Sequence, residues 1–130
     1  MSWTPPIPEQ LVSTNYGFVY LIINKTKNKF YVGKKQFRNK KSMKPLKNKK
    51  NKRIKYAESD WKTYNGSNKE LLKDIRKGDE IKKLVIALCD SAWMLKYQEA
   101  KTIINLDCLS RDDCYNGILQ IKLGRSPKKK

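Results

Sequence analysis

GFVYLIINKTKNKFYVG, at residues 17–33, is the stretch that decides the fold. Its first seven residues, GFVYLII, are aromatic and β-branched, which predicts a strand over 17–23. The polar residues 24–28 are typical of a turn, and KFYVG at 29–33 predicts the returning strand. The stretch is therefore expected to form a β-hairpin.

Two tyrosines, Tyr20 and Tyr31, lie on the two arms of this hairpin, 11 residues apart. An odd separation allows two residues of an antiparallel pair to oppose each other, and opposed residues project from the same face of the sheet. The two phenols can therefore share one side of the hairpin. Such a pair is either a cross-strand aromatic contact of the core or part of a site, and the spacing leaves both interpretations open.

The sequence beyond residue 60 predicts further elements that cover the hairpin. Ser67 and Glu70 form a capping box at the start of an amphipathic helix, for which Gly78 is a stop. IKKLVIAL at 81–88 predicts a buried strand, and residues 118–123 predict a short final strand.

A second helix is expected between these strands, capped by Asp90 or Ser91 and ending at about residue 106. Its inward stripe is expected to consist of four residues at helical spacing: Trp93, Tyr97, Ala100 and Ile104. At about 100° per residue, Glu99 lies roughly 120° from the centre of this stripe. Glu99 is therefore expected on a flank of the helix, either as a solvated surface residue or at the border of a cleft.

The order of elements predicts an α+β domain, in which helices flank a small sheet made of the hairpin and a later strand. The predicted organisation is an extended N-terminal arm over 1–16, the folded domain over 17–123 with a basic loop at 34–55, and a basic tail over 124–130.

The charge of the chain indicates a polyanionic partner. Thirty Lys and Arg against twelve Asp and Glu give a net charge of +18, and 15 of the 30 cations lie between residues 25 and 55. A surplus of this kind attracts nucleic acid, although a lysine-rich coding bias would also produce it. No stretch is long and apolar enough for a membrane span. Residues 40–52 are expected to be the most mobile internal segment without DNA.

The composition limits the available chemistry. The chain has no histidine, and its three cysteines, Cys89, Cys108 and Cys114, form no Cys-x-x-Cys pair, which argues against a zinc site. No secretory signal precedes them, so free thiols and a cytoplasmic location are expected. Any general base must be Tyr, Lys, Asp or Glu.

The hairpin resembles the two-part signature of the GIY-YIG nuclease family, with GFVY as the first part and YVG as the second. The resemblance extends over residues 17–119, because a capped helix, a strand, a helix with one acidic residue and a final turn with an asparagine follow in the order of that family. Glu99 and Asn116 occupy the last two places. DWKTYNGSNKEL, YVGKK and YNGIL further resemble stand-alone members from bacteriophage genomes, which implies a bacterial host cell.

The resemblance implies a DNA endonuclease that hydrolyses phosphodiester bonds. In that family the equivalent of Glu99 is the sole protein ligand of a divalent ion, here expected to be Mg²⁺ or Mn²⁺, and one of the tyrosines Tyr20 and Tyr31 activates or orients water. The family also implies a cation on the scissile phosphate. This sequence departs from the usual pattern here, because a lysine-rich segment follows YVG; Arg53 is the predicted residue, with Lys41 and Arg38 as alternatives.

Further residues are expected to contact DNA: Lys34, Lys35, Arg38, Lys41 and Asn116. Lys34 follows YVG directly and would contact phosphate or lower a tyrosine pKa, unless it is one more solvated lysine. Asn116 would fix the final turn or hydrogen-bond towards the site.

The alternative hypothesis is a basic nucleic-acid-binding protein without catalysis, whose aromatic residues pack or stack on bases. The stacking candidates are Trp61, Tyr64 and Tyr56. The nuclease hypothesis makes a geometric prediction, namely that the hydroxyls of Tyr20 and Tyr31 open onto the same concave surface as the carboxylate of Glu99. A protein partner or a homodimer could supply specificity or double-strand cutting.

Overall fold

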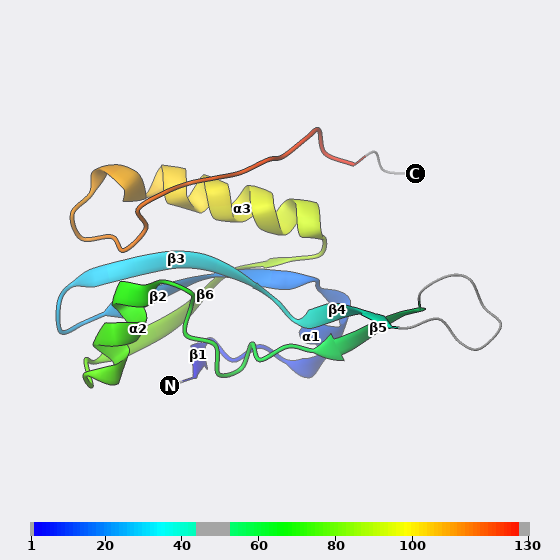
Figure 1. Ribbon diagram of the computed structural model, residues 1–130, viewed down its shortest axis with the longest axis horizontal. Coiled ribbons are helices and arrows are strands. Elements are labelled where there is room, and N and C mark those ends of the chain that lie inside the picture. The colour runs from blue at the N-terminus through cyan, green and yellow to red at the C-terminus, as the bar shows by residue number, and fades with distance from the viewer. Residues whose placement is uncertain (1, 44–52, 128–130) are drawn as a thin grey trace.

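The fold is built around a four-stranded sheet, seen in a computed structural model of the chain that describes residues 2–43 and 53–127, with side chains left out at 41–43 and 53–55. The strand order is β1-β6-β2-β3 (Figure 1). The strands are β1 (Trp3–Thr4), β2 (Gly17–Asn24), β3 (Lys29–Gln36) and β6 (Ile81–Cys89). β2 runs antiparallel to both of its neighbours, and β1 is parallel to β6.

Helices cover both faces of this sheet, which confirms the predicted α+β class. α3 (Ala92–Asn105) lies on one face, whereas α1 (Glu9–Thr14) and α2 (Lys69–Arg76) lie on the other (Figure 1). A short 3-10 helix (Cys108–Ser110) follows α3. No helix in the described part of the chain combines the length and apolarity that a membrane crossing requires.

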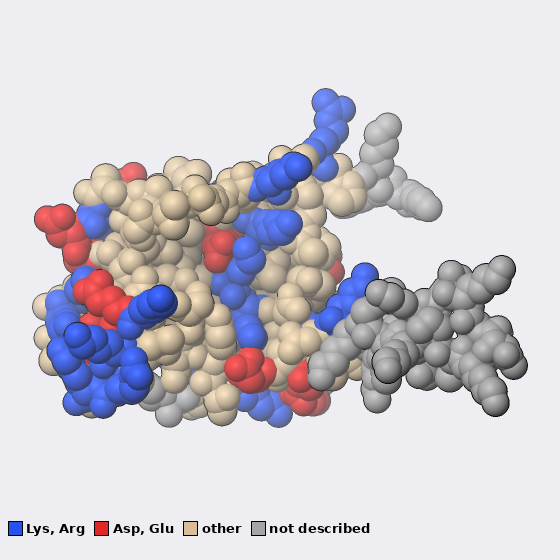
Figure 2. Space-filling view, viewed as in Figure 1, with Lys and Arg blue, Asp and Glu red and all other residues tan. Residues whose placement is uncertain are grey.

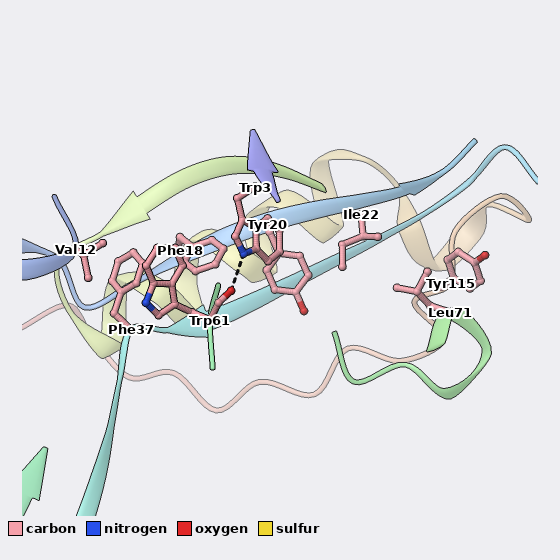
Figure 3. Packing of buried hydrophobic residues seen from close by; sticks show 9 residues of the cluster. All are labelled: Trp3, Val12, Phe18, Tyr20, Ile22, Phe37, Trp61, Leu71 and Tyr115. Carbon is pink, nitrogen blue, oxygen red and sulfur yellow. Dashed lines mark hydrogen bonds between the residues drawn. The ribbon is translucent and has the colours of Figure 1, made fainter. Parts of the chain in front are cut away.

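Alternation along β2 divides the core into two layers. Phe18, Tyr20 and Ile22 are fully buried and pack with Trp61 and Leu71 on the side of α1 and α2 (Figure 3). The residue between the first two, Val19, is also buried, but on the side of α3. β2 is buried on both faces because it lies between β6 and β3 and is covered from both sides.

The N-terminal segment is a corrected prediction, because residues 3–14 form β1 and α1 in place of an extended arm. Trp3 is buried, and its indole Nε1 donates a hydrogen bond to the carbonyl of Trp61 at 2.6 Å. Val12 of α1 is buried in the same cluster. The prolines of the segment predict an extended arm, but the Trp3 indole and the Val12 side chain pack on the sheet and hold the segment against it.

The start of α2 differs from the prediction by one residue. The N-cap is Asn68, whose side-chain oxygen accepts from the backbone amide of Leu71 at 3.0 Å. Asn and Ser are both favourable N-cap residues, so local sequence did not distinguish the two positions, and the predicted cap at Ser67 is wrong by one residue. Gly78 has a φ of +95° just beyond the helix, as the predicted stop requires.

The inward face of α3 is also corrected. The buried residues are Leu95, Ala100 and Ile103, whereas Tyr97 and Ile104 are exposed. Trp93 stacks on Tyr97 with ring centroids 5.1 Å apart and donates to the carbonyl of Gly124, so aromatic residues of the expected stripe lie beside the C-terminal segment instead. The predicted helix bounds and the Ser91 cap, which accepts from the amide of Met94, are confirmed.

Two predicted loop and strand assignments were wrong. The segment 34–55 is not one loop, because β3 extends to Gln36 and is followed by an antiparallel hairpin of β4 (Arg38–Met43) and β5 (Arg53–Glu58) that projects beyond the sheet (Figure 1). Most of the segment predicted to be mobile lies outside the described residues. Residues 118–123 form no strand, because the preceding segment already occupies the edge of β3 through a bridge between Phe30 and Cys114.

Candidate active site at the edge of β3

The two tyrosines of the hairpin share one face of the sheet, as predicted, but they do not oppose each other. Tyr20 pairs with Gly33 and Tyr31 pairs with Ile22, so the rings are offset diagonally. Their centroids are 6.2 Å apart. The offset arises because residues 25–28 form the four-residue turn that sets the register.

Two glycines make room for the rings. A Cβ on Gly33 would overlap the phenol of Tyr20. Gly66, which has a φ of +86°, lies against both rings, since a Cβ there would stand 3.3 Å from Tyr31 Cε2 and 3.4 Å from Tyr20 Oη. Tyr64 completes the cluster, with its ring edge-on to Tyr20 at 6.1 Å.

The two phenols differ in their surroundings. Tyr20 is 1% exposed, and burial, together with the nearby Tyr31, raises its pKa far above the ordinary value. Tyr31 is only partly buried, and its hydroxyl lies 3.5 Å from Ser67 Oγ. Burial raises its pKa as well, while the contact with Ser67 works in the opposite direction. Both hydroxyls are therefore neutral at pH 7, and Tyr31 is the one with access to solvent.

Glu99 reaches this cluster around the edge of β3. Its helix lies on the opposite face of the sheet from the tyrosines, but Glu99 contacts Lys34, which lines one hollow together with Tyr64 of the tyrosine cluster. Glu99 Oε1 lies 3.4 Å from Lys34 Nζ, and its side chain is 20% exposed. Glu99 is one helical turn from both Leu95 and Ile103 and is partly buried, so of the two expected positions it takes the one beside a hollow and not that of a fully solvated residue.

A hollow of about 230 Å³ lies at this edge. It is lined by residues from both sides of the sheet, among them Lys34, Lys35, Tyr64 and Leu95. Lys35 Nζ lies 2.8 Å from Asp60 Oδ1 and 4.1 Å from the centre of the Tyr64 ring. Figure 2 shows basic side chains in a narrow column across the middle of this face of the molecule. The edge of β3 therefore presents cations beside the tyrosine cluster.

The predicted phosphate-binding cations lie elsewhere or are described only in part. Arg38 donates to the carbonyls of Val12 and Asn15 at 2.9 and 2.7 Å, so its guanidinium binds the C-terminal end of α1. Arg53 opens β5 at the end of the hairpin away from the sheet, and Lys41 lies in β4. The side chains of the last two lie outside the described residues.

Asn116 lies beside the tyrosines and contacts backbone. Its Oδ1 accepts from the amide of Val32 and its Nδ2 donates to the carbonyl of Val32, both at 2.9 Å. Val32 is the neighbour of Tyr31, and the amide of Asn116 replaces a strand partner at the edge of β3. Asn116 thus fixes the backbone that carries Tyr31.

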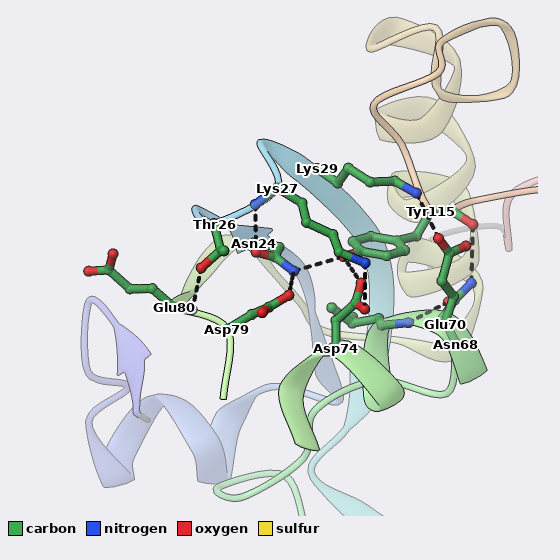
Figure 4. A network of polar contacts seen from close by, with 11 residues as sticks. Asn24, Thr26, Lys27, Lys29, Asn68, Glu70, Asp74, Asp79, Glu80 and Tyr115 are labelled. Atoms are coloured by element: carbon green, nitrogen blue, oxygen red, sulfur yellow. Dashed lines mark hydrogen bonds and ion pairs between the residues drawn. The ribbon is translucent and has the colours of Figure 1, made fainter. Parts of the chain in front are cut away.

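A polar network that the sequence reasoning missed surrounds this edge (Figure 4). Asp74 of α2 is 1% exposed; it accepts from Lys27 Nζ and from the hydroxyl of Tyr115, both at 2.7 Å. Tyr115 Oη in turn accepts from Asn24 Nδ2 at 3.0 Å. The sequence feature that could have revealed it is the spacing of Asp74 from Leu71, which puts this acid on the buried face of α2. The network fastens the turn of the hairpin to α2 and to the segment that carries Asn116.

The donor set at this edge fits a magnesium ion better than a zinc ion. Within the ranges that the structure describes, no three His, Cys, Asp or Glu side chains form a cluster that could hold a metal. Mg²⁺ does not need such a cluster, because it keeps several waters and binds through one or two carboxylates together with substrate phosphate. The single carboxylate of Glu99, in contact with Lys34 of the hollow, is compatible with that mode.

Comparison with known protein families identifies the family of the chain. A family model described as "Putative endonuclease segE, GIY-YIG domain" matches residues 3–119. Searches of curated proteins and of solved structures gave no significant match. The matched region includes β1 and α1, in agreement with their packing on the sheet.

Proposed function

The chain belongs to the GIY-YIG endonuclease family, and we propose on that premise that it hydrolyses phosphodiester bonds of DNA at the edge of β3. The observation that carries the proposal is that β3 presents Tyr31 from one face of the sheet and Lys34, in contact with Glu99, from the other. A nucleophile-activating group, an acid that can hold a divalent ion and a phosphate-binding cation are the parts that such a hydrolysis requires.

Tyr31 is the better placed of the two tyrosines to act on water. Its hydroxyl is accessible, whereas that of Tyr20 is enclosed by Gly33, Gly66 and Tyr64. In the proposed reaction Tyr31 orients the water that adds to phosphorus, and its phenolate form accepts the proton of that water. The bond from phosphorus to the leaving oxygen breaks, and that oxygen takes up a proton from solvent as the alcohol leaves. Tyr20 fixes the position of Tyr31 by packing against its ring.

Glu99 would hold Mg²⁺ or Mn²⁺, and the ion would supply Lewis-acid stabilisation of the charge that develops on the phosphate. In the free protein Lys34 lies against this carboxylate. Binding of the ion would displace Lys34 from Glu99, which leaves the ammonium group available to a phosphate oxygen. Lys34 and Lys35 are therefore the described cations best placed for the scissile phosphate, with Arg53 as the alternative from the sequence.

The net charge and the family resemblance support proposals about DNA affinity, strand cutting and the place of action. The net charge of +18 supplies affinity for the DNA backbone that falls steeply with salt. One site of this kind cuts one strand, so a double-strand cut would need a second copy or a protein partner. The resemblance to bacteriophage members suggests the cytoplasm of a bacterial host as the place of action.

Incubation of the protein with supercoiled plasmid tests the proposal. We expect nicked or linear product with Mg²⁺ or Mn²⁺ and none with EDTA. A Tyr31→Phe variant, purified in parallel, is the control for a contaminating nuclease, because it should bind the plasmid and leave it intact. If the wild-type protein binds DNA but cuts no form of it with any divalent ion, it is a binding protein and the proposal is wrong.

A further inference from the structure

A second hollow, of about 440 Å³, lies where β3 passes into the β4–β5 hairpin. Its lining comes from five residues: Tyr16, Gln36, Arg38, Lys40 and Tyr56. Each of these side chains carries at least one hydrogen-bond donor, two of them are cations, and none is a carboxylate. A hollow with this lining is built for an anionic ligand that also presents a flat or apolar surface.

The lining is held in place by the fold. Lys40 of β4 is directly opposed to Tyr56 of β5, so the two side chains project from the same face of the hairpin. Arg38 is fixed by the carbonyls at the end of α1, and the hydroxyl of Tyr16 donates to Gln36 Oε1 at 3.3 Å. The charge and the donors are therefore arranged before any ligand binds.

The side chain of Tyr56 is 62% exposed. A tyrosine ring that is exposed in a basic hollow is a platform on which a nucleobase can stack. The nearest acid of the hairpin does not oppose this use, since Glu58 accepts from Trp61 Nε1 at 3.1 Å and lies 3.7 Å from Lys62 Nζ.

The hollow adjoins the one at the candidate active site. Gln36 lines both this hollow and the one beside Lys34 and Lys35. Gln36 is five residues from Tyr31 along β3, about 16 Å of extended strand. A DNA strand that follows β3 away from the tyrosines therefore reaches the hollow within a few nucleotides of the scissile phosphate.

We infer that this hollow binds one nucleotide of a single-stranded stretch of the DNA substrate, with the phosphate beside Arg38 and Lys40 and the base stacked on Tyr56. The strand must be unpaired there, because in a duplex the faces of each base are already covered by its neighbours. The inference rests on the proposed function only in taking DNA as the ligand, since it concerns binding and not cleavage.

Binding of a fluorescein-labelled oligothymidylate, measured by anisotropy in EDTA so that no cleavage occurs, tests this inference. Tyr56→Leu should weaken binding roughly 5- to 100-fold, whereas Tyr56→Phe should retain most of the affinity. Lys40→Gln should make the slope of log affinity against log salt shallower by about 0.7. The matched controls are Tyr97→Leu and Lys82→Gln, which remove an exposed tyrosine and an exposed lysine outside the hollow. Tyr97→Leu should leave the affinity for the oligothymidylate unchanged, and Lys82→Gln should leave the salt slope unchanged.

Each outcome decides for or against the hollow. A loss for Tyr56→Leu that is larger on the single strand than on a duplex of the same length supports it. Equal losses on both DNA forms, unchanged affinity in Tyr56→Leu, or a wild-type protein that binds no DNA would overturn it. A wild-type protein that binds through Tyr56 but cuts nothing would leave this inference standing and remove the proposed nuclease function, so the two failures are distinguishable.

Discussion

The phenol of Tyr20 lies over Gly33, so close that any side chain at position 33 would overlap it. Gly33 is the last residue of the Tyr-Val-Gly stretch that carries Tyr31, and it pairs with Tyr20 in the ladder. The two halves of the motif are therefore one packing unit. Because Gly33 has no side chain, the ring of Tyr20 can extend from β2 across β3, where it lies against Tyr31.

Substitution of this glycine tests the packing unit. Gly33→Ala should destabilise the fold by about 1–3 kcal/mol, the usual cost of overpacking a filled core. Tyr20→Leu removes the ring that the added methyl group meets, so Gly33→Ala should cost less in the Tyr20→Leu background. Urea unfolding of the four proteins measures this coupling. Additive effects of the two substitutions would show that position 33 is restricted by something other than Tyr20.

The two tyrosines should differ when each loses its hydroxyl. Tyr31→Phe should lower the cleavage rate by about 10²–10⁴, the range of a lost general base, with DNA affinity unchanged. Tyr20→Phe should have a much smaller effect, because that hydroxyl is enclosed. Burial holds the pKa of Tyr31 above its ordinary value, so the wild-type rate should still rise with pH beyond pH 9. Single-turnover rates from pH 7 to 10 measure this, and a larger loss in Tyr20→Phe would exchange the assigned roles.

Much of this site could be predicted from the sequence, and the errors have physical causes. The hairpin, the shared face of Tyr20 and Tyr31 and the bounds of α3 follow from local pattern, because β-branched runs and caps act over a few residues. The orientation of α3 was wrong because apolar residues occur around most of its circumference, and only the sheet and the C-terminal segment decide which of them are buried.

The features that the sequence could not predict depend on long-range contacts. Nothing local in PPIPEQL shows that Trp3 pairs its backbone with Lys83 and buries its ring, since the partner is 80 residues away. The buried role of Asp74 likewise depends on Lys27 and Tyr115, which lie on other elements. The hydrogen bonds that hold Arg38 at the end of α1 also depend on tertiary structure, and its contact with DNA stays a prediction.

The Asp74 network should make stability depend on pH. The hydrogen bond from Lys27, followed by that from Tyr115, holds the pKa of Asp74 below its ordinary value. Its contribution is therefore complete above about pH 4 and is lost as the pH falls through the lowered pKa. Asp74→Asn should be less stable than wild type by about 1.5–3 kcal/mol at pH 7, with the difference shrinking below pH 4. Urea unfolding at pH 7 and pH 3 measures it, with Asp112→Asn, at an exposed position, as the control.

Lys83 should make stability depend on pH in a second, more alkaline window. It is 1% exposed, with its Nζ 3.2 Å from Asn65 Oδ1 and 4.2 Å from the Trp3 ring, and burial lowers its pKa to about 8. The unfolded chain binds more protons between pH 8 and 10.5, so the wild type should gain stability as the pH rises through that window. Relative to Lys83→Met, the gain should be about 1–3 kcal/mol. Lys82→Met, on the exposed neighbour, should show no such gain.

Glu99→Gln separates binding from catalysis, because it preserves the size of the side chain and removes its charge. The ion pair with Lys34 is partly exposed, so its loss should change the free energy of unfolding by no more than about 1 kcal/mol. DNA affinity in EDTA should hold or rise slightly, since a negative charge beside a polyanion is removed. Cleavage with Mg²⁺ should fall by orders of magnitude, because each 1.4 kcal/mol of lost transition-state stabilisation is about tenfold in rate.

A matched control is Glu80→Gln, which removes the same charge at an exposed position before β6 and should cleave like the wild type. If Glu99→Gln folds, binds and still cleaves at nearly the wild-type rate, Glu99 does not hold the ion. The convergence of groups at the edge of β3 would then be a packing arrangement only, because the tyrosines and Lys34 alone bring no ligand for a divalent cation.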